Sequence, residues 1–149
     1  EERMFNDSIT RVAADPDANP LRSDGVRWLP LVQGNINVPV LTMHTLGDFY
    51  VPFRHQQLYR ERVEDYGKGD LLVQRAIRAA GHCEFTDQEY YDATSDFLNW
   101  IGTGVVPEGD EVLDPEVVAD PNYGCEFTDK ESPEAMLNRS TLPQCEVDA

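Results

Sequence analysis

Residues 40–52, VLTMHTLGDFYVP, and residues 77–85, IRAAGHCEF, decide how this chain is expected to fold. In each stretch an apolar run stops at a turn, and one polar side chain follows directly: Asp48 in the first and His82 in the second. The nearly continuous apolar run over 38–45 is typical of a parallel strand that is covered on both faces. Both polar side chains should therefore lie just past the end of a buried strand.

A helix is expected between two parallel strands. Pro52 suits the first turn of a helix, because its missing N–H would have no intrahelical partner there. The helix should run to about Tyr66, and Gly67 can end it in the left-handed conformation. The side chains expected on its apolar face are Leu58, Tyr59, Val63 and Tyr66. With a second strand over 71–77, the pattern predicts two parallel neighbours joined by a right-handed crossover.

A second helix should begin four residues after His82. Thr86 and Glu89 have the spacing of a capping box, and Phe85 and Tyr90 occupy the two positions of a hydrophobic staple. Apolar side chains then recur at helical spacing until glycines end the pattern. A capped helix so close to His82 should hold the intervening loop in one conformation.

Asp48 precedes His82 by 34 residues, which is the chain order of acid and base in one class of Ser…Asp…His triads. In such a triad the acid accepts a hydrogen bond from Nδ1–H of the histidine, and the histidine takes the serine proton as general base. The alternatives are an ordinary turn aspartate and a loop histidine without a role. The order and the strand-end positions favour the catalytic interpretation.

The chain offers no serine in the setting that a nucleophile of this kind requires. A nucleophile elbow has the pattern G-x-S-x-G. The serines are Ser8, Ser23, Ser95, Ser132 and Ser140, and none has glycine two residues away on both sides. The nucleophile is therefore expected on an upstream segment or a second chain.

The stretch from about Val38 to Trp100 resembles the α/β-hydrolase fold, and the wording HTxGDxxVP…GHCxFT is similar to that of secreted bacterial esterases. The resemblance implies the C-terminal portion of an α/β-hydrolase sheet: two parallel strands with flanking helices, followed by an irregular acidic tail. It also implies a secreted serine hydrolase that acts on small-molecule esters without a cofactor, with peptide or amide bonds as the second choice. The pair His82-Cys83 is similar to an arrangement in tannase and feruloyl-esterase-type enzymes, in which that cysteine is bridged to one beside the serine.

Two further histidines are present. His44 lies inside the first expected strand and should be a buried, hydrogen-bonded residue, whereas His55 should lie on the surface or at the rim of the site. A metal site built from His44, Asp48 and His82 would match no zinc spacing, so no metal is expected.

The net charge of −16 is unevenly distributed. Residues 105–149 carry 12 acidic and two basic side chains, a net charge of −10, whereas residues 1–104 carry −6. This excess argues against binding to nucleic acid and to anionic membranes. No apolar run approaches the length of a membrane span, and the first ten residues lack the pattern of a signal peptide. We expect residues 1–104 to belong to the hydrolase domain and residues 105–149 to form a proline-rich tail that wraps the surface.

The three cysteines suggest one bridge within that tail. Cys125 and Cys145 are expected to be bonded to each other, and Cys83 to be bonded outside this chain or left as a buried thiol. The alternative for Cys83 is a small buried apolar residue without a bond.

Two strands cannot cover their own edges and faces, so a large apolar surface should be buried against a second polypeptide. We expect that interface to exceed roughly 2,000 Å². The competing interpretation is a non-catalytic acidic interaction module on a hydrolase-like scaffold, which the missing serine and the acidic tail favour.

Overall fold

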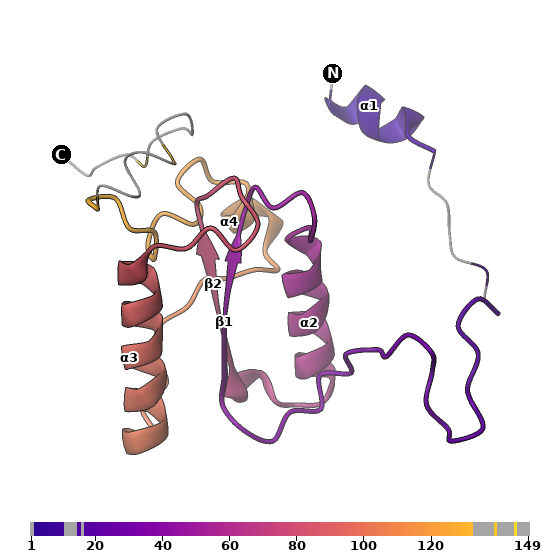
Figure 1. The fold of residues 1–149 in the computed structure, drawn as a ribbon. Coiled ribbons are helices and arrows are strands. Elements are labelled where there is room, and N and C mark those ends of the chain that lie inside the picture. The colour runs from indigo at the N-terminus through magenta and orange to yellow at the C-terminus, as the bar shows by residue number, and fades with distance from the viewer. Residues whose placement is uncertain (1, 11–14, 16, 133–138, 140–144, 146–149) are drawn as a thin grey trace. The chain divides into compact units, whose positions relative to one another are not determined.

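A computed structural model describes residues 2–10, 15, 17–132, 139 and 145 of the chain (Figure 1). The chain divides into two compact units, Glu1–Val32 and Gln33–Ala149. The first unit contains helix α1, Glu2–Ser8, followed by turns and a single antiparallel bridge between Leu21 and Arg27. The prolines, the glycine and the polar residues of this unit are typical of loops.

The second unit has an α/β arrangement built on two parallel strands. Strand β1, Val40–Thr45, pairs with β2, Leu72–Ile77, in a register that sets Val40 opposite Leu72 and Thr45 opposite Ile77. Every residue of β2 is buried, whereas the first four residues of β1 are partly exposed. The predicted strands and their parallel pairing are confirmed.

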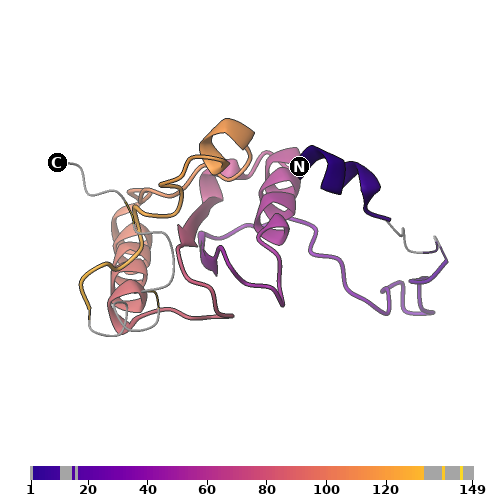
Figure 2. The same ribbon diagram turned by 90° about the horizontal axis from the view of Figure 1, so that it is seen from above.

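The two long helices flank the strands in both views (Figures 1 and 2). Helix α2, Arg54–Asp65, follows β1, and a 3-10 turn, η1, Gly69–Leu71, leads into β2. Helix α3, Asp87–Thr103, follows the His82 loop, and the short helix α4, Pro115–Val118, is the last helix among the described residues.

Helix α2 packs on the sheet through a mixed apolar and polar surface. Val63 is fully buried, and Gln74 of β2 donates from its side-chain amide to the Gln56 side chain over 2.7 Å. Arg60 in turn donates to the Gln74 side chain over 3.0 Å. The prediction that Tyr66 belongs to the apolar face is wrong, since Tyr66 is 49% exposed. It occupies the C-cap, where the helical turn has already ended and no longer directs the side chain inward.

Helix α3 begins as predicted. The Thr86 hydroxyl accepts the Glu89 N–H at 3.2 Å, and the Glu89 carboxylate accepts the Thr86 N–H at 2.9 Å, which completes the capping box. The rings of Phe85 and Tyr90 meet edge to face with centroids 5.4 Å apart, as a staple requires. Gly104 ends the helix in the left-handed conformation with φ 77°.

The segment around Asp110 lies along the outer edge of β2. The Asp110 N–H donates to the Gln74 carbonyl over 2.8 Å, and the Asp110 carboxylate accepts the Ala76 N–H over 2.7 Å. Gly109 permits this approach, because a Cβ there would lie 2.9 Å from the Gln74 carbonyl oxygen. Val112, from the same segment, is almost completely buried. This part of the chain therefore covers a strand edge that would otherwise expose unpaired backbone groups. The division into a domain over 1–104 and a tail over 105–149 stays a prediction.

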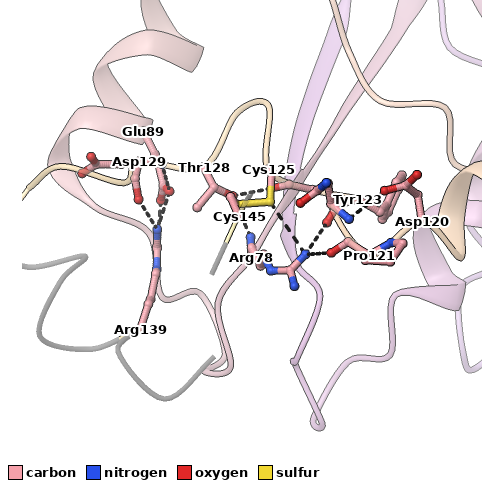
Figure 3. The surroundings of a disulfide bond; sticks show 12 residues. Arg78, Glu89, Asp120, Pro121, Tyr123, Cys125, Thr128, Asp129, Arg139 and Cys145 are labelled. Atoms are coloured by element: carbon pink, nitrogen blue, oxygen red, sulfur yellow. Dashed lines mark hydrogen bonds and ion pairs between the residues drawn. A yellow bond between two sulfur atoms is a disulfide. The ribbon is translucent and has the colours of Figure 1, made fainter. Parts of the chain in front are cut away.

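The predicted bridge between Cys125 and Cys145 is present, with the two Cα atoms 5.8 Å apart (Figure 3). Beside it, the Arg78 guanidinium donates to the carbonyl oxygens of Pro121 and Tyr123. The bridge thus fastens the far end of the chain to a segment that is already held against β2. Across the residues described, no helix is both long and apolar enough to span a bilayer.

Loss of this bridge should destabilise the protein by about 3 kcal/mol, the chain-entropy value for a closed loop of about 20 residues. Urea unfolding of a Cys125→Ala/Cys145→Ala double variant measures the loss. Cys83→Ser, which breaks no bridge in this chain, is the matched control. A double variant within about 0.5 kcal/mol of the wild type, the scatter of neutral substitutions, would contradict a stabilising role.

Candidate active site

Asp48 lies in the turn that follows β1. Gly47, just before it, packs so closely on the next loop that a Cβ there would lie 2.7 Å from the Ala80 Cα. The backbone N–H groups of Tyr50 and Val51 both donate to Oδ1 of Asp48 over 2.9 Å. Its second carboxylate oxygen is therefore left to face the loop after β2.

The second oxygen meets the histidine. Oδ2 of Asp48 lies 2.6 Å from Nδ1 of His82, so the contact expected from the sequence is confirmed. The Asp48 side chain is 4% exposed and the His82 side chain 46%, so the acid is enclosed while the ring extends toward solvent. The roles of these two residues in catalysis stay predictions.

The surroundings of the Asp48 carboxyl group favour its ionised form. Burial raises its pKa, but hydrogen bonds from the Val51 amide, the His82 ring and the Tyr50 amide lower it by more. The pKa of Asp48 therefore lies below its ordinary value of 3.8. A carboxylate that keeps its charge at neutral pH can orient an imidazole and stabilise the imidazolium that forms when the ring takes up a proton.

The loop that carries His82 is braced on both sides. The Thr45 hydroxyl at the end of β1 donates to the Gly81 carbonyl over 2.7 Å, and the Glu84 carboxylate accepts the Gly81 N–H over 2.7 Å. The Tyr50 ring meets the imidazole edge to face, with centroids 5.7 Å apart. These contacts limit the positions open to the ring.

Cys83 projects beside the histidine. Its Sγ lies 3.6 Å from Nε2 of His82, and its backbone has φ 53°, which is unusual for any residue except glycine. Cys83 is exposed, so the expectation of a buried thiol is wrong. A bond from Cys83 to another chain stays a prediction.

The other histidines lie where the sequence indicates. His44 is buried, with Nδ1 2.9 Å from the Thr45 carbonyl oxygen and its ring against Phe53. His55 is exposed near the start of α2. Within the described part of the chain, no three His, Cys, Asp or Glu side chains are arranged to hold a metal ion.

The hydrogen bonds of His82 to described residues go to Asp48 and Cys83, and none goes to a serine. Ser140 lies outside the described residues. The location of the nucleophile stays a prediction.

Sequence reasoning missed an ion pair beside the His82 loop (Figure 3). Arg139 holds Glu89 with two hydrogen bonds, of 2.6 and 2.9 Å, and its Nη2 also donates to the Glu84 carbonyl over 2.8 Å. Glu89 was recognisable only as a helix cap. Fifty residues separate the two charges, and no local pattern links them.

Comparison with known proteins gives one informative similarity. The chain is 32% identical over 76 residues to an o-phthalyl amidase of Xanthobacter agilis. The match covers 51% of this chain and 17% of that protein, so the chain spans only a small part of its relative. No family model matches the chain, and no solved structure matches it.

Proposed function

We propose that the chain is the C-terminal part of a serine hydrolase of the α/β type, in which Asp48 is the triad acid and His82 the general base. The observation that carries this proposal is the 2.6 Å contact between the enclosed carboxylate and Nδ1 of a half-exposed imidazole. The tautomer that this contact favours has its proton on Nδ1, which leaves Nε2 able to accept one.

The reaction follows from that tautomer. A serine hydroxyl, supplied from outside these residues, attacks the substrate carbonyl while Nε2 of His82 accepts its proton. The imidazolium, stabilised by Asp48, then protonates the leaving group as the tetrahedral intermediate collapses to an acyl-enzyme. A water molecule then attacks the acyl-enzyme, again with His82 as the base, and the carboxylic acid product is released. The hydrogen-bond donors that stabilise the oxyanion of the tetrahedral intermediate come from the serine-bearing part.

The substrate class is a small carboxylic ester or amide. The resemblance of the sequence pattern HTxGDxxVP…GHCxFT to that of esterases supports an ester substrate. The similarity to a protein named o-phthalyl amidase supports an amide, whose poor leaving group depends most on the proton that His82 donates. The bridge between Cys125 and Cys145 supports an extracellular location, because disulfides persist in oxidising compartments.

The serine-bearing part should join at the free edge of β1. In the described part of the chain, β1 has β2 as its one strand neighbour. Large apolar side chains stay exposed before β1, after it and on α3; they are Val38, Phe49, Tyr50, Tyr91, Leu98 and Ile101. An interface above roughly 2,000 Å² would cover such a surface.

The test begins with the chain alone. Purified Cys83→Ala protein of verified mass should not hydrolyse p-nitrophenyl acetate above background, because the thiol beside His82 is then gone and the chain offers no serine in the setting of a nucleophile elbow. Co-expression with a polypeptide that bears G-x-S-x-G should restore hydrolysis, and a fluorophosphonate probe should label that serine. Activity of the chain alone would show that the nucleophile is misplaced. A stable monomer of 16.9 kDa that accepts no such partner would favour the acidic interaction module instead.

A further inference from the structure

One buried arginine joins the loop that carries His82 to the helix that follows it. Nη2 of Arg139 donates to the Glu84 carbonyl over 2.8 Å and to Oε2 of Glu89 over 2.9 Å. Glu84 lies two residues after His82, and Glu89 lies in the first turn of α3. Figure 3 shows the guanidinium directed at the Glu89 carboxylate. A single nitrogen therefore links the loop to the helix.

Glu84 is the residue through which this link reaches His82. The Glu84 carboxylate accepts the Gly81 N–H over 2.7 Å, while its carbonyl accepts the bond from Arg139. Glu84 therefore holds the backbone just before the histidine and is itself held just after it. On the other side, the Thr45 hydroxyl donates to the Gly81 carbonyl over 2.7 Å. The loop is thus tied to β1 at its start and to α3 at its end, and its displacement would break one of these hydrogen bonds.

The guanidinium is enclosed and keeps its charge. The Arg139 side chain is 8% exposed. Burial lowers its pKa, but the hydrogen bond and charge of Glu89, and the charges of Glu84 and Asp129, raise that pKa by more. A planar guanidinium can bind both oxygens of one carboxylate, which fixes its orientation as well as its position. Arg139 also lies between the two bridged cysteines in the sequence, so the crosslink limits how far it can move away.

We propose that Arg139 is a positioning residue for His82: it holds the loop so that Nδ1 of the ring stays against Asp48. This inference rests on the proposed function, in which that contact keeps the base in its working tautomer. Arg139 acts through Glu84 and the first turn of α3. The alternative is that Arg139 only fastens the end of the chain to α3, which would stabilise the fold without affecting the ring.

The tautomer of the His82 ring distinguishes the two roles. Long-range proton–nitrogen NMR correlations of the whole chain show which ring nitrogen carries the proton, and the His82→Gln spectrum identifies the signals. The measurement is made at about pH 8.5, roughly two units above the ordinary histidine pKa, where neutral rings dominate. In the wild type, the Asp48 carboxylate should keep the proton on Nδ1. A loss of global stability alone does not change the tautomer in molecules that stay folded.

The variant combines Arg139→Met with Glu89→Gln, because Arg139→Met alone would leave a buried carboxylate unpaired. Glutamine can still accept the Thr86 N–H, which preserves the capping box. The ratio of the Nδ1–H to the Nε2–H tautomer should fall by at least about fivefold, the equivalent of one weakened hydrogen bond.

Two controls accompany this variant. Glu89→Gln alone keeps the bond from Arg139 to the Glu84 carbonyl. Val63→Ala opens a cavity at a fully buried residue of α2 and destabilises the fold without touching the loop. Both should leave the tautomer ratio within about twofold of the wild type, since neither removes the hydrogen bond to Glu84.

Two results would overturn the inference. One is an unchanged tautomer ratio in the double variant with an unchanged circular dichroism spectrum, which would leave Arg139 as a fastening of the chain end. The other is an equal fall in Glu89→Gln alone, which would assign the effect to the charge of Glu89. Neither result bears on the proposed hydrolase. A wild-type ring with its proton on Nε2 would instead contradict the pairing of Asp48 with His82, and with it the proposed function on which the inference rests.

Discussion

Replacing His82 by alanine is expected to lower kcat/KM of the assembled hydrolase, this chain together with its serine-bearing part, by at least about a thousandfold. The loss follows because the serine would have no proton acceptor and the leaving group no donor. Asp48→Asn should lower kcat by about ten-thousandfold, because an amide favours the wrong tautomer of the ring. Hydrolysis of p-nitrophenyl acetate and of the matching anilide measures both effects.

The control for this experiment is His55→Ala, which removes an exposed imidazole from α2 and should leave the activity unchanged. Each variant should also co-purify with the serine-bearing part, which shows that assembly survives. An assembled His82→Ala protein with more than a tenth of the wild-type kcat/KM would exclude His82 as the general base.

Arg139→Met is expected to destabilise the fold by about 3 kcal/mol, because it leaves a buried carboxylate without its cation. The side chains of Arg139 and Glu89 are 8% and 1% exposed, and two hydrogen bonds join them. Two backbone N–H groups, those of Thr86 and Asp129, also donate to Glu89, so that carboxylate cannot turn toward water without breaking the cap of α3. Urea unfolding measures the change in the free energy of unfolding.

Arg54→Met is the matched control, since it makes the same chemical change in a pair that water surrounds. Arg54 and Glu61 are 3.0 Å apart, with side chains 55% and 42% exposed, and such pairs contribute less than about 1 kcal/mol. Equal losses in the two variants would mean that Arg139 contributes no more than a surface charge.

Much of the fold was predictable because its signals are local. The apolar run of β1, the proline before α2 and the capping box of α3 each depend on residues close together in sequence. The contact between Asp48 and His82 was predictable for a different reason. The carboxyl ends of neighbouring parallel strands lie at one edge of a sheet, so two polar residues just past those ends meet there.

The contacts that could not be predicted from the sequence depend on tertiary packing. The Asp110 carboxylate completes the edge of β2 from 34 residues away, and Arg139 neutralises Glu89 across 50. No periodicity or motif in the sequence indicates either pairing. Each depends on a single charged side chain that the tertiary fold brings next to its partner. Similarly, no local sequence pattern indicates the positive φ of Cys83 or its exposure.

The direct contact between Arg139 and the Glu84 carbonyl has a consequence for the order in which the protein matures. During synthesis His82 leaves the ribosome well before the arginine that braces its loop, and chains begin to fold from the N-terminal side. The strands and the acid can therefore assemble on a nascent chain while the base still lacks its final support. The support of this loop depends on a residue that is translated 57 residues after the base (139 − 82 = 57), so a nascent chain can carry the residues of the dyad without that support.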